Sequence, residues 1–193
     1  MLWNRFVGTL AAGGVGGAFL LVGLSQGAIA ASFTVSGSYF SVSAGELTGT
    51  GFVLFGGNDR TASGQNRAAV STGFRTASLR DFCLAAVTPD VPLLGPLTVK
   101  ITASGSSPSQ AENLVLNLQN LIGDLALKKA DIGVDAGQFK NGPDGAVGVP
   151  GGFGVQGAEI TVTGVKAIAS STTSTSLALK GMRLTATAGA SGC

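Results

Sequence analysis

Apolar and polar residues alternate with a period of two along most of the chain after the amino-terminal segment. Residues 97–103 read Leu-Thr-Val-Lys-Ile-Thr-Ala, and similar alternation recurs at 114–119 and 160–163. Successive side chains of a β-strand point to opposite faces, so this period predicts strands with one apolar face and one polar face rich in Ser and Thr. Residues 110–119 are the best candidate for a helix, yet alternation fits them better. We predict a mainly β body over residues 32–193, folded as an antiparallel sandwich or as a sheet wrapped around a shared core.

The amino-terminal segment, residues 1–31, has a different pattern. Residues 6–24 contain no charged side chain, and one positive charge precedes them. Such a run is long enough to cross a bilayer as a helix, although Ala28-Ile29-Ala30 also fits the cleavage site of a secretory signal. We expect a hydrophobic helix, either a retained membrane anchor or a signal peptide, with retention favoured and the rest of the chain outside the cell. Gly13 and Gly17 would let such helices pack closely.

Residues 142–159 consist of six consecutive Gly-X-Y triplets. A collagen triple helix needs glycine at every third position, and Pro143 and Pro150 favour the polyproline II backbone. We expect a short polyproline-like segment through which copies of the chain associate, with a trimer preferred. A glycine-rich loop is the plain alternative, and a strap packed closely on the β body is another. The six glycines are Gly142, Gly145, Gly148, Gly151, Gly154 and Gly157.

Charged residues are scarce in this chain. They make up 11% of it, against about 25% in a typical soluble domain, and the net charge is +2. We therefore expect Ser, Thr and Gly to supply much of the polar surface, and part of the surface to be buried against other copies or lipid. The small net charge without a basic cluster argues against a nucleic-acid partner. The apolar strand faces could form a lipid-holding groove, although an ordinary core is the simpler interpretation.

Candidate catalytic and metal-binding residues are few. The chain has no histidine, which excludes the Ser-His-Asp triad, the Cys-His dyad and imidazole zinc sites. Residues 23–27 match the G-x-S-x-G pattern around Ser25, but they lie in the hydrophobic segment rather than between a strand and a helix. Asp124, Asp131 and Asp135 are the closest group of acids, yet no D-x-D-x-D-G calcium loop is present, and solvated turns explain them better. We expect no catalytic residues, metal or cofactor.

The chain contains two cysteines, Cys83 and Cys193. A disulfide is the natural interpretation in an exported protein, and it would close a loop of roughly 110 residues. Two unpaired thiols and a bond between subunits are the alternatives.

Several segments resemble, in the same order, a family of actinobacterial exported envelope proteins of unknown function. They are residues 26–37, Phe82-Cys83 with Val87-Thr88-Pro89, residues 130–136, residues 142–154 and Cys193. Members of that family are sometimes labelled cholesterol esterase by automatic transfer, a label that the residues do not support. The resemblance implies a Gram-positive envelope or extracellular setting and implies that Cys83 and Cys193 belong together.

We therefore expect a non-enzymatic, structural, self-assembling protein of the bacterial cell envelope. It would lie at the cell membrane facing outward, or outside the cell, with itself and membrane lipid as partners. The alternative is a lipid-binding module with an apolar groove near the membrane, and an esterase is the least favoured interpretation.

Overall fold

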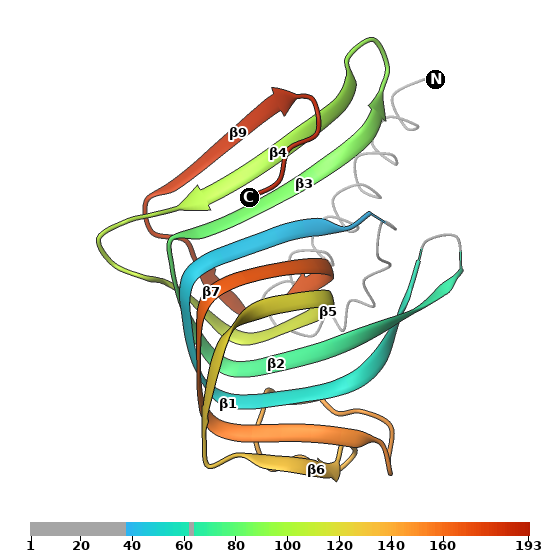
Figure 1. The fold of residues 1–193 in the computed structure, drawn as a ribbon, viewed down its shortest axis with the longest axis vertical. Coiled ribbons are helices and arrows are strands. Elements are labelled where there is room, and N and C mark those ends of the chain that lie inside the picture. Colours follow the sequence, from blue (N-terminus) through green and yellow to red (C-terminus); the bar gives the residue numbers. More distant parts are fainter. Residues whose placement is uncertain (1–37, 62–63) are drawn as a thin grey trace, which may run out of the picture. The chain divides into compact units, whose positions relative to one another are not determined.

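The computed structural model describes residues 38–61 and 64–193 (Figure 1). The hydrophobic helix expected over residues 1–31 lies outside this range, together with Gly13, Gly17 and Ser25. Within the range there is no helix long and apolar enough to span a membrane. The described residues form nine strands: β1 (Phe40–Arg60), β2 (Asn66–Arg80), β3 (Phe82–Val91), β4 (Gly95–Ala103), β5 (Ser109–Lys128), β6 (Asp131–Asp135), β7 (Phe153–Thr173), β8 (Ser176–Ala178) and β9 (Met182–Ala188).

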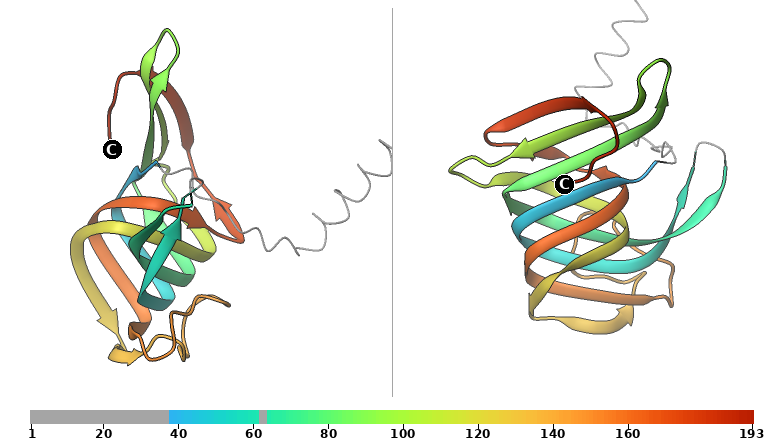
Figure 2. Two further views of the ribbon diagram at one scale, coloured as in Figure 1. Left: turned by 90° about the vertical axis from the view of Figure 1, so that its right-hand side faces the viewer. Right: turned by 45° about the horizontal axis from the view of Figure 1, so that its top comes forward.

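Four long strands close on themselves. β1 pairs with β2, β2 with β5, β5 with β7, and β7 returns to β1, so these four strands form a ring (Figures 1 and 2). All strand pairs described are antiparallel. The mainly β, antiparallel fold is therefore confirmed. The nine strands belong to one sheet, which curls so that β7 pairs with β1.

The largest group of buried apolar residues lies on the inside of this ring. On β1 the buried residues include both Leu47 and Phe52, which simple alternation would place on opposite faces. Gly51 lies between them with a φ of 60°, in the left-handed region that glycine tolerates best. The same change of phase occurs opposite it on β2, where Phe74 and Ala77 both face the core. A bend at a glycine therefore keeps two long strands apolar toward one interior.

The other strands extend the sheet from one side of the ring. β3 pairs with residues 40–43 of β1, and β4 and β9 follow outward to the edge of the sheet (Figure 2). The register places Leu84, Ile101 and Leu184 in one row across the three strands, on the same face. This extension carries the apolar pattern of residues 97–103 that the sequence predicts as a strand, and that prediction is confirmed.

The polyproline-like conformation expected for residues 142–159 is wrong for this structure. Gly142, Gly145 and Gly151 have φ values of 100°, 79° and 78°, whereas polyproline II requires φ near −75°. Residues 153–159 belong to strand β7, and residues 142–152 form an irregular loop with turns. The physical reason is the pairing of β7 with β1 and β6, which satisfies backbone groups that a lone polyproline strand would leave to water.

The loop between β6 and β7 nevertheless packs as a strap against the outer face of the ring. Ala136 and Ala146 of the loop form a buried cluster with Val53 and Phe55 of β1. Close approach needs glycine here: a Cβ on Gly142 would lie 2.7 Å from Val53 Cγ1. The alternative of a strap whose glycines allow tight packing therefore describes the loop correctly, without the polyproline backbone.

Candidate functional site

The interior of the ring holds an apolar cavity of about 220 Å³. All four ring strands contribute to its wall, and β3 and β8 add to it. Most of the lining is aliphatic or aromatic, and it contains no charged side chain. The lining residues are Phe40, Val42, Leu47, Phe52, Leu54, Thr72, Phe74, Leu79, Phe82, Leu84, Leu114, Leu116, Leu118, Leu121, Leu125, Ile160, Val162, Val165, Ala167, Thr172, Thr173, Ser174 and Leu177.

Three of the leucines that line the cavity are themselves about half-exposed. Leu121 and Leu125 of β5 and Leu177 of β8 line it, yet they are 46%, 59% and 54% exposed. We refer to these three leucines as the apolar mouth of the cavity, because exposed apolar side chains that line a cavity are typical of a binding site. The volume is below the roughly 300–1,000 Å³ of pockets for drug-sized ligands, so the cavity suits a slender chain better than a bulky group.

Hydroxyl groups in the lining fall into two kinds. Thr172 and Ser174 are exposed at the rim, and Thr173 is partly buried. Thr72 is different, because it is 1% exposed. Among the described residues, its Oγ1 is a buried side-chain atom that makes no hydrogen bond. Leaving a buried hydroxyl unpaired costs about 1–3 kcal/mol, so this group needs an explanation.

A second hollow of about 100 Å³ adjoins the cavity. The two share Leu54, Thr72, Leu118 and Leu121, so Thr72 stands where they meet. A third depression, of about 450 Å³, is more open and is lined by parts of β1, β2, β5, β7 and β8. Its wall is rich in threonine and carries Glu112 and Glu159. It offers no comparable enclosed surface for a ligand.

The acidic residue Glu159 in that open depression is already paired. Its Oε2 lies 2.8 Å from Lys128 Nζ. The hydrogen bond and the positive charge of Lys128 lower the pKa of Glu159, and the same contact raises the pKa of Lys128. The carboxylate is thus held in its charged form, which does not suit a general acid.

A buried polar network ties the four ring strands together at one end. Asp59 of β1 accepts hydrogen bonds from Asn117 Nδ2 of β5 at 2.5 Å and from the hydroxyl of Ser170 of β7. Ser71 Oγ of β2 donates to Asn117 Oδ1 at 2.7 Å. Asp59 and Ser170 form an acid–hydroxyl pair, but the chain has no histidine to act as a base between them. We interpret the network as a structural clamp that fixes the ring.

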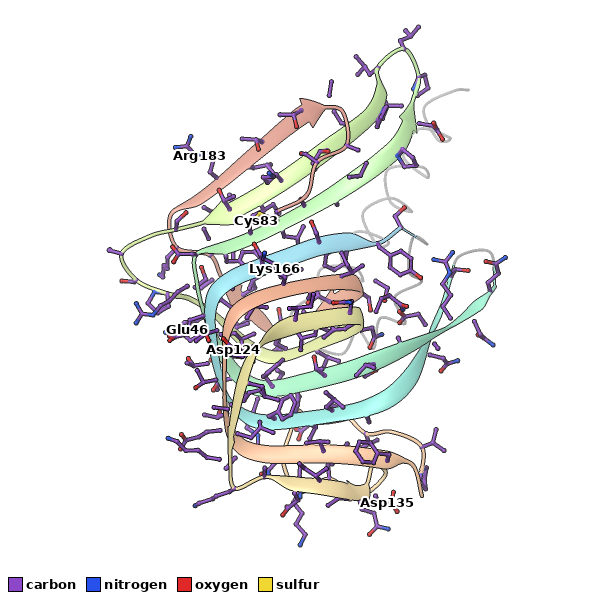
Figure 3. The ribbon with its side chains drawn as sticks, in the orientation of Figure 1. Glu46, Cys83, Asp124, Asp135, Lys166 and Arg183 are labelled. Atoms are coloured by element: carbon purple, nitrogen blue, oxygen red, sulfur yellow. A yellow bond between two sulfur atoms is a disulfide. The ribbon has the colours of Figure 1, made fainter. Side chains whose placement is uncertain are left out.

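The carboxyl groups considered for calcium do not gather into a site. Asp124 lies on β5, whereas Asp131 and Asp135 lie on β6, and Figure 3 shows Asp124 and Asp135 well apart. The described residues contain no group of three or more His, Cys, Asp or Glu that could hold a metal ion. Asp135 Oδ1 instead accepts hydrogen bonds from the backbone N–H groups of Gly137 and Gly151, both at 2.8 Å, and these bonds lower its pKa.

The six triplet glycines have separate surroundings. A Cβ on Gly148 would meet Ala136 Cβ at 2.7 Å, and one on Gly154 would meet the ring of Phe139 at 2.6 Å. Gly145 and Gly151 have open space around them, and Gly157 makes only ordinary contacts. The glycines that recur every third residue therefore do not share one kind of contact within a single chain.

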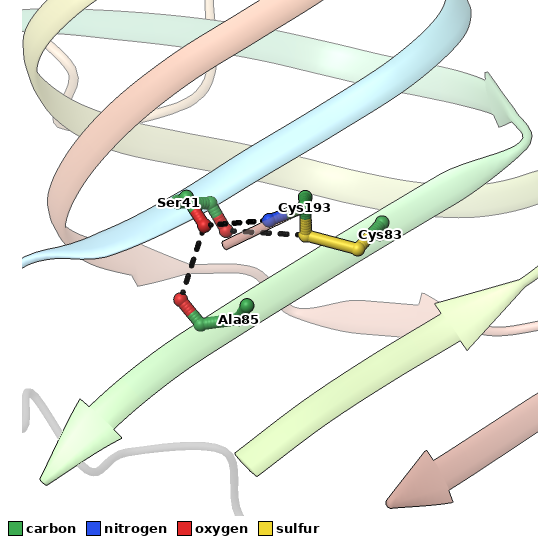
Figure 4. The surroundings of a disulfide bond; sticks show 4 residues. All are labelled: Ser41, Cys83, Ala85 and Cys193. Atoms are coloured by element: carbon green, nitrogen blue, oxygen red, sulfur yellow. Dashed lines mark hydrogen bonds between the residues drawn. A yellow bond between two sulfur atoms is a disulfide. The ribbon is translucent and has the colours of Figure 1, made fainter. Parts of the chain in front are cut away.

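The predicted disulfide is present. Cys83 and Cys193 are bonded, and they close a sequence separation of 110 residues (Figure 4). Cys193 N also donates to Ser41 Oγ at 3.2 Å, so the carboxy terminus is held against β1 as well as β3. This agrees with the pairing that the family resemblance implied and fixes the end of the chain beside the ring.

The comparisons identify a family without a function. The family of unknown function DUF6230 matches residues 36–193, which is more than three quarters of the chain. The chain therefore belongs to this family. Searches of curated proteins and of solved structures found no similar protein. A family of unknown function is what the sequence resemblance led us to expect, while the expected origin and the esterase label stay untested.

Proposed function

We propose that this member of the DUF6230 family binds the apolar chain of a lipid or a similar amphiphile inside the strand ring. The observation that supports this is the apolar cavity with its mouth of half-exposed leucines. Each CH₂ group moved from water into such a site gains about 0.8 kcal/mol, so eight of them would gain about 6 kcal/mol before the costs of ordering the ligand.

A lipid surface is the proposed source of the ligand. The turn between β3 and β4, residues 91–96, contains no charged residue. Leu93 is fully exposed there, with a φ of 70°, and Leu94 is mostly exposed. An uncharged turn that presents two leucines to solvent suits insertion into the boundary of a bilayer. The disulfide supports a location outside the cytoplasm, because cytosolic thiols are kept reduced.

Ligand binding can be tested with a neutral, rod-shaped fluorescent probe, 1,6-diphenyl-1,3,5-hexatriene, titrated into the full chain. We expect saturable binding that replacement of the cavity-lining Leu116 by Trp weakens at least tenfold, because the indole fills the space. Ile132→Trp is the matched control, since Ile132 is exposed on β6 and outside the cavity. If Leu116→Trp does not fold, Leu125→Lys places a charge at the exposed mouth instead. The proposal fails if the native chain binds no probe. It also fails if Leu116→Trp and Leu125→Lys bind the probe as tightly as the native chain does.

A second candidate function is self-association as a structural protein. It is favoured by β9, which ends the order of strands in the sheet and has seven exposed residues. In the described part of the chain no strand pairs with its outer edge, and a free edge is a template for pairing with another copy. Light scattering of the purified chain should give a multiple of the monomer mass that Leu184→Lys with Ala186→Lys reduces. A monomer at high micromolar concentration would contradict this function.

A further inference from the structure

Among the residues that the structure describes, Thr72 has a buried hydroxyl that makes no hydrogen bond to the protein. It lies on β2 between Leu54 of β1 and Leu116 of β5, which are its partners in the strand register. Both leucines line the cavity, and so does Thr72. Its hydroxyl is thus placed in an apolar wall, 1% exposed and without a hydrogen bond to the described residues.

The neighbouring hydroxyl on the same strand shows the contrast. Ser71 points to the opposite face, and its Oγ donates to Asn117 Oδ1 at 2.7 Å. Among the described residues, Thr72 Oγ1 is the buried side-chain atom that the protein does not satisfy. Buried polar groups are nearly always paired, so a partner is expected from outside the chain.

We infer that the cavity takes an uncharged amphiphile with one oxygen, a hydroxyl or a carbonyl, that hydrogen-bonds to Thr72 Oγ1. This inference rests on the proposed function and adds the chemistry of the ligand. A threonine hydroxyl can donate to a carbonyl or accept from a hydroxyl, so both oxygen types fit it. A charged oxygen does not fit, because the lining has no Lys or Arg to balance a carboxylate or phosphate taken out of water.

The exposed part of the lining fits a ligand with one apolar end and one more polar end. Thr172 and Ser174 line the cavity where it is exposed, so a more polar end can stay there in contact with water. The ligand would therefore enter with its uncharged oxygen directed toward Thr72, while the end that stays at the rim keeps its contact with water.

The test compares ligands of equal chain length by competition with 1,6-diphenyl-1,3,5-hexatriene. The ligands are 1-decanol, 2-decanone, decane and decanoate, which carry a hydroxyl, a carbonyl, no oxygen and a carboxylate. We expect the native chain to bind the alcohol or the ketone about three- to tenfold more tightly than decane, as one net hydrogen bond predicts, and to bind decanoate weakly. Preference for the alcohol or for the ketone tells which oxygen is recognised.

Thr72→Val should remove that preference and leave the affinity for decane within about twofold. Thr72→Ser should keep it, because the hydroxyl is retained. Thr76→Val is the matched control, since Thr76 lies on the same strand and bonds Thr50 in the open depression outside the cavity. Thr72→Val should also raise the melting temperature of the ligand-free protein, because no hydrogen bond is lost.

Three outcomes would overturn the inference. If Thr72→Val prefers the alcohol or the ketone over decane as strongly as the native chain does, Thr72 does not recognise the oxygen. Binding of the apolar chain would still stand in that case. A lower melting temperature for Thr72→Val would show that the hydroxyl is already used within the protein. Absence of binding by every ligand and by the probe would instead refute the proposed function itself.

Discussion

Replacing triplet glycines one at a time separates the packed loop from a collagen-like role. A triple helix needs every third residue to be glycine, so Ala at Gly142, Gly145 or Gly157 would cost a similar amount. The structure predicts three different costs. Gly142 has a φ of 100°, and its Cβ would lie 2.7 Å and 2.8 Å from the two Cγ atoms of Val53, which is fully buried.

The magnitudes follow from those surroundings. A left-handed backbone costs a residue with a side chain about 1–2 kcal/mol, and overpacking against a rigid neighbour adds about 1–3 kcal/mol. Gly142→Ala should therefore destabilise the fold by about 2–5 kcal/mol. Gly145→Ala has the left-handed φ of 79° but open space, so only the first cost of about 1–2 kcal/mol applies. Gly157→Ala meets Leu127 at an ordinary 3.5 Å and should be neutral, or stabilising by up to about 1 kcal/mol.

The assay is urea unfolding of the full chain at 25 °C, followed by circular dichroism of the β signal. The free energy of unfolding should fall in the order Gly157→Ala, Gly145→Ala, Gly142→Ala, with similar dependence on urea concentration. Equal losses at all three positions would support the period of three and refute the packing argument. A harmless Gly142→Ala would show that the loop does not pack on Val53 as described.

Three further predictions concern other parts of the chain. Cys83→Ala with Cys193→Ala should lower the free energy of unfolding by about 4–5 kcal/mol, the loop-closure value for a separation of 110 residues, and reduction of the native chain should match it; a loss below about 1 kcal/mol would contradict this. The carboxylate of Asp135 has a lowered pKa in the folded state, so its contribution is complete above about pH 4 and is lost as pH falls through that lowered pKa. The melting temperature of the native chain minus that of Asp135→Asn should thus shrink below about pH 4, and a difference independent of pH would refute the assignment. Leu93→Ser with Leu94→Ser should reduce binding to neutral phosphatidylcholine vesicles in a flotation assay without changing the melting temperature; unchanged flotation would remove the turn from membrane contact.

Much of the strand content could be predicted from the sequence because alternation is a local property. Residues 97–103 and 160–163 show their period of two without any knowledge of their neighbours, and both lie in strands. Proline is a weaker guide to where these strands end. Pro89 lies within β3, which runs to Val91, and Pro96 lies within β4, which begins at Gly95. A break in register between Thr88 and Val91 accommodates Pro89 there.

The candidate site could be predicted only in outline. Apolar strand faces indicate a core or a groove, but they do not say whether the enclosed space is full. Thr72 carries a weak local signal, since Val70, Thr72 and Phe74 share one face and only the middle residue is polar. We did not predict Thr72 as a site residue, because Ser and Thr were expected on the outward faces of the strands. Whether such a hydroxyl meets a partner depends on β1 and β5, which are distant in sequence.

The sequence by itself determined the β class, the scarcity of charge, the absence of histidine chemistry and the presence of two cysteines that can bond. These are matters of residue type and period, which act over a few neighbours. Only the tertiary structure decided that β1, β2, β5 and β7 close into a ring and that the glycine triplets divide between a strap and a strand. It also placed Thr72 inside the ring without a hydrogen bond to any described residue. Those outcomes depend on which strands pair and where glycines such as Gly51 turn the alternating faces inward, and local alternation carries no information about pairing over long separations.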